Sequence, residues 1–322
     1  MKLAWKSAAT FAFAAIAATT AGAQEKVPYP ADTVSLVTHS SPGGGTDVFL
    51  REMVNHLSKY LDADFVVENV RGGSGAKAMA HLAAADTNGS VLYGTTPTYI
   101  NTSLLSKPEK TYADLQPVAN IFLDPQIVFV RKDSPYNTLA ELVEAGKAAP
   151  GTMKFGVTTP GSLDRQVMEQ FKAVTGIDGP VITHDGGGDL LINVLNGTVD
   201  MGIGEIQELT GQLAAGEVRV IATYTENRLA EHPDVPTAKE QGVDIVVDKF
   251  RGLAGPKGMS EEAIAAWEKA IPMLLEDADF KAWYSQASLV PTFIPHDEYA
   301  TFIEEFAKEQ EAFFVKYNIT EE

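Results

Sequence analysis

The regular alternation of short β-type runs with helical patterns is the feature that most restricts how this chain can fold. Apolar β-type runs occur at 34–38, 64–69, 91–95, 127–130, 154–158, 180–183, 199–203, 218–224 and 249–255. Helical patterns occur at 46–60, 75–84, 138–148, 162–175, 187–196, 206–215, 260–276, 278–287 and 296–316. Such alternation predicts the α/β class, with parallel sheets covered by helices on both faces.

The chain of 322 residues exceeds one comfortable hydrophobic core, yet no Pro/Ser-rich linker divides it. This predicts a discontinuous arrangement. Residues 24–124 and 223–322 form domain 1, and residues 125–222 form domain 2. The chain then crosses between the domains twice, at 121–128 and near Tyr224, and the two crossing strands act as a hinge. The cleft between the domains is lined by the carboxyl ends of strands, where open α/β sheets place their ligands.

The first 23 residues read as a secretory signal peptide. Lys2 and Lys6 form a basic start, residues 8–20 are almost all apolar or small, and Ala21-Gly22-Ala23 is a cleavage site. We therefore expect export to the periplasm. The absence of cysteine excludes a disulfide framework and fits this compartment.

The formal net charge of −18 repels nucleic acid and anionic membranes, so neither is an expected partner. If the ligand is an anion, its attraction must come from local dipoles and a few placed cations. Solubility alone also accounts for an acidic surface.

Motifs typical of enzymes are incomplete in this sequence. GGGTDV (43–48) lacks the last glycine of a dinucleotide-binding loop, and no phosphate-binding loop with Gly-Lys-Ser/Thr is present. GGSGA (72–76) falls one residue short of a nucleophile elbow around Ser74. The six histidines have no metal-ligand spacing, so we expect no metal, no cofactor and no catalytic residues.

Five turns rich in glycine and hydroxyl side chains each follow a strand and precede a helix. They are SSPGGGTD (40–47), NVRGGSG (69–75), GTTPTY (94–99), VTTPGSLDR (157–165) and HDGGGD (184–189). Any one of them is an ordinary loop. Together they gather helix N-termini and hydroxyl donors, among them Thr95 and Thr96, around one cleft, which suits a carboxylate.

These turns carry a family resemblance. SPGGGTDVFLREMVNHL, followed by VVENVRGGSG, resembles the first domain of substrate-binding proteins of tripartite tricarboxylate transporters, the Bug or TctC family. LLINVLNGTVDMGIGEI, HPDVPTAKEQGVDI and RGLAGPKGMSEEAI resemble later segments in the same order. The resemblance implies a two-domain periplasmic-binding-protein fold of type II, the Venus-flytrap fold. It also implies that the chain delivers a small organic carboxylate to the membrane subunits of a transporter; we expect it to act as a monomer.

The resemblance also implies which residues hold the ligand. The first turn maps to Ser40, Ser41, Gly43, Gly44, Thr46 and Asp47. The second-domain turn maps to Thr158, Thr159 and Ser162. Asp47 is expected to orient its turn because two carboxylates repel each other. Arg165 stands where many relatives have His, and its planar guanidinium suits a second carboxylate; pairing with Asp164 or Glu169 is the alternative.

Other departures and alternatives stay open. Gly204-Glu205 stands where many relatives have an Asp that grips an amine or water, a role that Glu205 could take over. Arg71 is either a cation at the cleft mouth or merely exposed. A second hypothesis is an exported hydrolase that uses Ser74 with His184, and a third is a receptor that presents its ligand to a sensor kinase.

Overall fold

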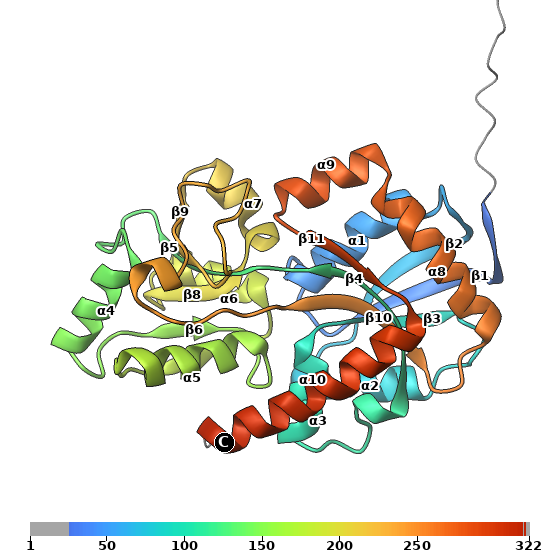
Figure 1. The fold of residues 1–322 in the computed structure, drawn as a ribbon, viewed down its shortest axis with the longest axis horizontal. Helices are drawn as coiled ribbons and strands as arrows, with labels where there is room; N and C mark the ends of the chain where they lie inside the picture. The colour runs from blue at the N-terminus through green and yellow to red at the C-terminus, as the bar shows by residue number, and fades with distance from the viewer. Residues whose placement is uncertain (1–25, 318, 320–322) are drawn as a thin grey trace, which may run out of the picture.

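The computed structural model describes residues 26–317 and 319, and these form two α/β lobes side by side (Figure 1). The first lobe is built on a six-stranded sheet and the second on a five-stranded sheet. The two-domain α/β prediction is therefore confirmed, whereas the predicted signal peptide lies outside the described residues. No helix in this described part is both long and apolar enough to span a bilayer.

The first lobe has the strand order β11-β4-β10-β3-β1-β2. Its strands are β1 (Val27–Thr38), β2 (Leu61–Asn69), β3 (Val91–Thr95), β4 (Leu115–Leu123), β10 (Phe250–Pro256) and β11 (Val290–Ile294). Its helices are α1 (Gly45–Leu57), α2 (Ala76–Ala83), α3 (Pro97–Leu105), α8 (Glu261–Leu275), α9 (Ala278–Gln286) and α10 (His296–Tyr317), with short 3₁₀ turns at Gly73–Gly75 and Tyr112–Asp114.

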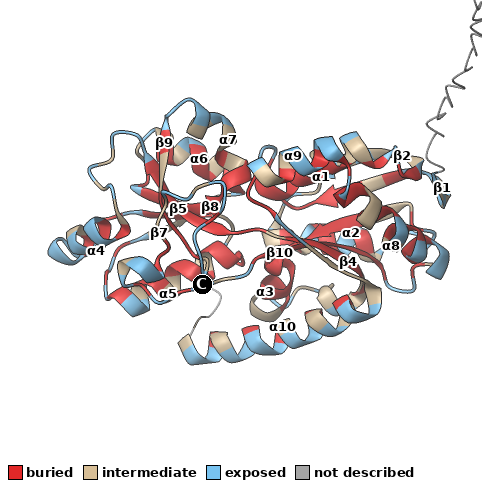
Figure 2. Ribbon diagram, turned by 45° about the horizontal axis from the view of Figure 1, so that its top comes forward, coloured by how far each residue is buried: buried red, intermediate tan, exposed pale blue. Residues whose placement is uncertain are grey.

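Helices cover both faces of the first sheet. Because successive strand residues point to opposite faces, their side chains pack into two separate cores. Leu36 packs in one core with Trp267 of α8, whereas the next residue, Val37, packs in a second core with Tyr99 of α3. The inner strands β3, β4 and β10 are accordingly mostly buried, whereas the edge strands β2 and β11 are partly exposed (Figure 2).

The second lobe has the strand order β7-β6-β8-β5-β9. Its strands are β5 (Gln126–Arg131), β6 (Phe155–Val157), β7 (Val181–Thr183), β8 (Met201–Glu205) and β9 (Val218–Thr223). Its helices are α4 (Leu139–Ala148), α5 (Leu163–Thr175), α6 (Gly187–Leu195) and α7 (Ile206–Ala214), with a 3₁₀ turn at Lys239–Gln241. The alternation recurs here, since Val128 and Phe129 pack in different cores.

The expectation of purely parallel sheets is wrong. β10 runs antiparallel to β3 and β4, and β5 runs antiparallel to β8 and β9. These strands, β10 and β5, enter from the other lobe instead of closing a strand-helix-strand unit, so no crossover helix sets their direction.

The apolar periodicity of the sequence also failed to predict α3, β4 and β11. α3 is rich in Thr, Ser and Asn and is buried over most of its length, so it carries no apolar stripe.

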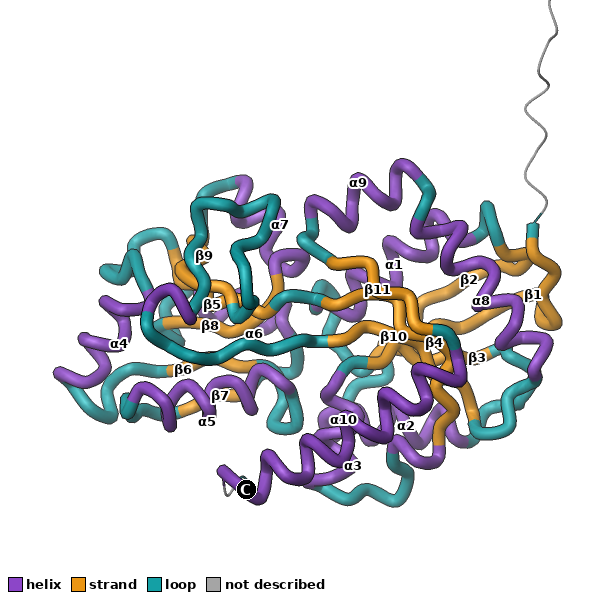
Figure 3. Tube along the Cα trace, viewed as in Figure 1, coloured by secondary structure: helices purple, strands orange, loops and turns teal. Residues whose placement is uncertain are grey.

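Two segments connect the lobes and lie side by side (Figure 3). Only Asp124 and Pro125 separate β4 from β5, and the backbone N–H of Asp124 donates to the carbonyl of Lys249 on the returning segment at 2.7 Å. The sequence analysis ended domain 2 at residue 222. Residues 224–247, however, contribute Tyr224, Ala238, Val243 and Ile245 to the second lobe's core. We therefore propose a boundary near Lys249.

Candidate functional site

The loops at the carboxyl ends of strands β1, β3, β6, β7 and β8 meet between the lobes and enclose a cavity of about 30 Å³. The cavity is lined by His39, Ser40, Gly45, Thr46, Thr96, Thr98, Thr158, Thr159, Asp185, Gly186, Gly187, Glu205, Glu208, Lys249 and Arg251. Four of the five predicted turns thus share one cavity. The fifth, after β2, reaches the opposite lobe through Arg71.

The turn after β1 aims the start of α1 at this cavity. Gly43 has φ +80°, a conformation that glycine adopts without strain, and its N–H donates to Asp47 Oδ2 at 2.9 Å. Asp47 also accepts from Arg51 and Asn69, so its carboxylate orients the turn and is not among the cavity-lining residues. The N–H of Gly45, in the first turn of α1, is consequently directed at the cavity, where it donates to Glu208.

The structure brings only part of the predicted site to the cavity wall. Six predicted residues line it: Ser40, Thr46, Thr96, Thr158, Thr159 and Glu205. Three of the other predicted residues contact protein groups that do not line the cavity. Thr95 Oγ1 lies 3.0 Å from the hydroxyl of Tyr299, and Ser162 caps α5 by accepting from the N–H of Arg165 at 3.1 Å. The N–H of Gly44 donates to the carbonyl of Ser41.

Arg165 does not line the cavity. Its Nε donates to Glu169 Oε1 at 2.7 Å, one turn further along α5. Residues four apart on a helix face each other, so a nearby carboxylate captures the guanidinium. The structure thus shows the pairing with Glu169 that the alternative described, and a contact between Arg165 and a ligand carboxylate stays a prediction.

The cations at the cavity are instead Lys249 and Arg251, which the sequence analysis missed. Arg251 is 1% exposed; its Nε and Nη2 bind Asp124, and its Nη1 donates to Thr46 Oγ1 at 3.0 Å. Lys249 pairs with Glu205 and, at 3.3 Å, with Asp164. The sequence did contain a signal for these cations. They stand two residues apart in an otherwise apolar strand-like run, which places both side chains on the same face of the strand.

The buried charges of this cluster shift one another's pKa values. Burial alone would lower the pKa of Lys249, but Asp164 and Glu205 raise it above its ordinary value. Burial raises the pKa of Asp124 to about 6 even though Arg251 opposes the shift. The pKa of Glu205 is lowered because Lys249 and Arg251 outweigh its burial. The two cations therefore stay charged where the lobes meet.

Comparisons with known proteins identify the family of this chain. The family described as "Tripartite tricarboxylate transporter family receptor" matches residues 49–319. The chain belongs to this family. Protein BugT of Bordetella pertussis is 26% identical over 280 residues, which cover 85% of this chain and 86% of BugT.

Two solved structures show the same fold as this receptor. The R. palustris protein Rpa4515 with adipate has a TM-score of 0.86 at 24% identity and covers 91% of this chain and 99% of its own. MatC from Rhodopseudomonas palustris with bound malate has a TM-score of 0.80 at 23% identity and covers 88% of this chain and 99% of its own. The predicted periplasmic-binding-protein fold is thus confirmed.

His39 gives the receptor a specific acid sensitivity. It begins the loop after β1, its ring contacts the hydroxyl of Tyr93, and burial together with Lys249 and Arg251 lowers its pKa from 6.5 to about 4. A neutral histidine of this kind contributes stability above pH 6.5 that is lost as the pH falls towards 4. Relative to His39→Gln, the wild type should lose about 2 kcal/mol of unfolding free energy between pH 7.5 and 5. Urea unfolding at both pH values measures this, and parallel pH dependences would contradict it.

Arg71 joins the two lobes at the edge of the cavity. Its Nη2 donates to Asp185 at 2.7 Å and to Asp189 at 3.2 Å, both near the start of α6 in the opposite lobe. The partners are exposed, so the pair is worth about 0.2–1 kcal/mol. Arg71→Ala should therefore speed ligand release by at most about fivefold, and less at 0.5 M salt. Stopped-flow release measures this, with Lys132→Ala at the far end of β5 as the control. An unchanged release rate at low salt would argue against the contact.

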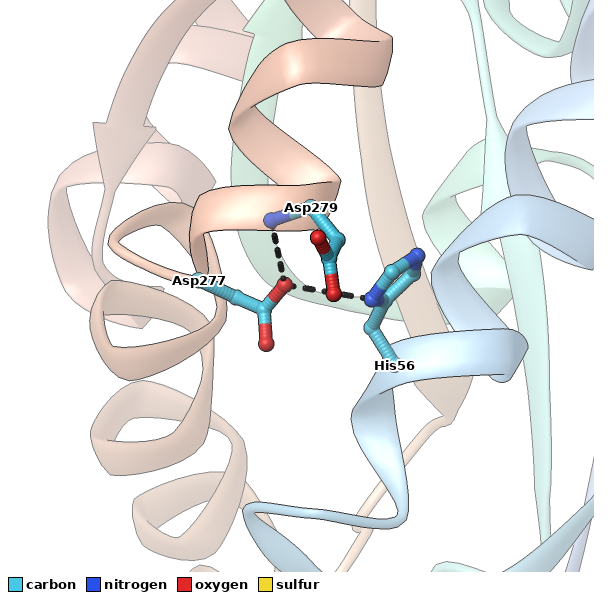
Figure 4. Close-up of side chains that lie close together, drawn as sticks. All are labelled: His56, Asp277 and Asp279. Carbon is cyan, nitrogen blue, oxygen red and sulfur yellow. Dashed lines mark hydrogen bonds and ion pairs between the residues drawn. The ribbon is translucent and has the colours of Figure 1, made fainter.

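One cluster outside the cavity has the composition of a metal site. His56, Asp277 and Asp279 lie close together (Figure 4). Asp277 is already engaged, since it caps α9 by accepting from Asp279 and Phe280 and binds Lys59 at 2.8 Å. Although burial acts to raise it, the pKa of Asp277 falls well below its usual range because of these donors. The cluster therefore joins α9 to α1 and supports no metal proposal.

Proposed function

We propose that this receptor captures a small organic carboxylate between its two lobes and delivers it to the membrane subunits of a tripartite tricarboxylate transporter. One observation carries the proposal. The N-termini of α1 and α6, from opposite lobes, meet at one cavity together with the buried cations Lys249 and Arg251. Helix N-termini offer unpaired N–H donors and a positive dipole end, which favour anions.

Helix dipoles and buried cations at the cavity offset the repulsion between an anionic ligand and a protein with a net charge of −18. Each helix terminus contributes about 0.3–1 kcal/mol, and more where partly buried. Hydroxyls from Thr46, Thr96 and Thr159 line the same cavity and add neutral donors. A set of this size supports micromolar affinity, about −8 kcal/mol.

Binding without catalysis is the second part of the proposal. In the described residues Ser74 Oγ has one hydrogen-bond contact, at 3.5 Å to the N–H of Gly161, and the ring of His184 contacts the carbonyl of Val157 instead. A serine nucleophile needs a base within hydrogen-bond reach. These contacts therefore favour the receptor over the hydrolase hypothesis. We also propose that the chain acts in the periplasm as a monomer, after cleavage of the signal peptide.

A ligand screen tests this function. Thermal shift and then calorimetry are run on C3–C6 mono- and dicarboxylates, with malate and adipate included because two neighbours in fold were solved with them. We expect at least one acid to bind with a Kd in the micromolar range or below. The methyl esters and amides of the same acids are the control and should not bind. A screen in which no acid binds would contradict the proposal.

A further inference from the structure

Glu208 fills the place in the cavity where a ligand carboxylate would bind. Its Oε1 accepts the N–H of Gly45 at 2.6 Å, so its carboxylate lies at the start of α1 although Glu208 itself belongs to α7 of the second lobe. A Cβ added at Gly187 would come within 2.0 Å of Oε1, and one added at Gly204 would come within 2.9 Å of Oε2. The carboxylate therefore rests against glycines from both lobes.

No side-chain cation pairs with Glu208 in the described part of the chain. Arg251 is held by Asp124 and Lys249 by Asp164, and Glu205 contacts both cations. The contact that holds the Glu208 carboxylate is a backbone N–H at a helix start, which is the kind of donor expected to hold a ligand acid.

The junction around Glu208 also contains an unused donor. Ser41 is 1% exposed, and its hydroxyl has no hydrogen-bond partner among the described residues. It lies against the start of α6, since a Cβ at Gly186 would come within 2.4 Å of its Oγ. A buried hydroxyl without a partner is costly, which indicates that this junction is built to receive a further acceptor.

We propose that Glu208 is an internal competitor of the ligand: its carboxylate occupies the anion site when the lobes close without ligand, and the ligand's carboxylate displaces it. This inference rests on the proposed function. The free cavity of about 30 Å³ has room for only two or three waters. A carboxylic acid of four to six carbons therefore does not fit beside Glu208 in this arrangement of the lobes. Displacement makes Glu208 a determinant of specificity. Only an acid whose interaction free energy with the glycine turns exceeds that of the Glu208 side chain will bind.

The test compares Glu208→Gln and Glu208→Ala with the wild type by calorimetry, using malate and adipate as probes. The matched control is Glu217→Gln, the same substitution at an exposed position beyond the end of α7. Burial and the neighbouring Glu205 raise the pKa of Glu208 well above its ordinary value, so Glu208→Gln tests the fit of the carboxyl group at Gly45 and not only its charge. We expect both Glu208 variants to bind the acid that the wild type binds at least tenfold more tightly, and the control to be unchanged. Equal or weaker binding by the Glu208 variants would overturn the inference.

A second readout needs no ligand. The chain has no cysteine, so fluorophores can be attached specifically to Asp62→Cys in the first lobe and Asp133→Cys in the second. Energy transfer between them should show a larger closed fraction in the ligand-free wild type than in Glu208→Ala; identical distributions would overturn the inference. If no protein binds either acid, the proposed function has failed and the competitor role fails with it. Tighter binding without any change in closure would leave the function standing and remove Glu208 from the closed contact.

Discussion

Arg251→Met will destabilise the folded protein by about 3–5 kcal/mol and abolish carboxylate binding. Arg251 is buried and binds Asp124, and its Nη2 lies 3.5 Å from Glu205 Oε2. Methionine fills similar volume but leaves Asp124 buried without a cation, and an uncompensated buried charge accounts for a loss of this size. Urea unfolding at pH 7 gives the stability, and calorimetry with the best acid from the screen gives the affinity.

The double variant Asp124→Asn/Arg251→Met separates the two effects. It removes the lone charge together with the guanidinium, so most of the lost stability should return. Carboxylate binding should stay lost because the cavity still lacks one of its two cations, with Lys249 already paired to Asp164 and Glu205. A single Arg251→Met variant as stable as the wild type would contradict the account of this cluster, and so would a double variant that binds the acid normally.

Gly188→Ala will weaken ligand binding by roughly 10- to 100-fold while leaving the lobes folded, since overpacking costs about 1–3 kcal/mol. Gly188 lies in the first turn of α6, in the second lobe. A Cβ there would come within 2.8 Å of the carbonyl oxygen of Pro42 in the first lobe. Backbone on one lobe thus blocks the new methyl group on the other, but only when the lobes close. Calorimetry measures the affinity, and thermal unfolding without ligand checks the fold.

Gly211→Ala is the matched control for this substitution. Gly211 is also helical, in α7, and a Cβ there would meet nothing within 4 Å. Both alanines are better helix formers than glycine, so neither variant should lose thermal stability through propensity. If Gly188→Ala and Gly211→Ala bind the acid equally well, the contact between lobes is not part of the liganded state.

The glycine turns could be predicted from the sequence because their signal is local. The order of strand, glycines and helix around Gly43 fixes where a helix begins, and strands of one sheet bring such starts to a common edge. The same local reasoning left two roles open for Arg165, because Glu169 stands four residues away and competes for the guanidinium. Whether the Arg165 guanidinium pairs with Glu169 or reaches the cavity depends on the distance between α5 and the cavity, which local sequence patterns do not give.

The charged part of the site was not predictable from local patterns. Arg251 contacts Thr46 and Glu205, which are distant in sequence and reach it only through packing of β10 against the first sheet and closure of the lobes. Glu208 contacts Gly45 from the other lobe for the same reason. The later second-domain boundary that we propose was not visible in the sequence, because residues 224–247 are mostly irregular and still pack into the second core.

A crystal structure of the receptor with the acid selected by the screen tests the central claim most directly. We expect the acid between the lobes, with one carboxylate oxygen within hydrogen-bond distance of the backbone N–H of Gly45 or Gly187 and with Glu208 moved away from Gly45. An acid bound outside this cavity, or one whose carboxylate contacts neither glycine turn, would contradict the claim that backbone donors from both lobes form the binding site.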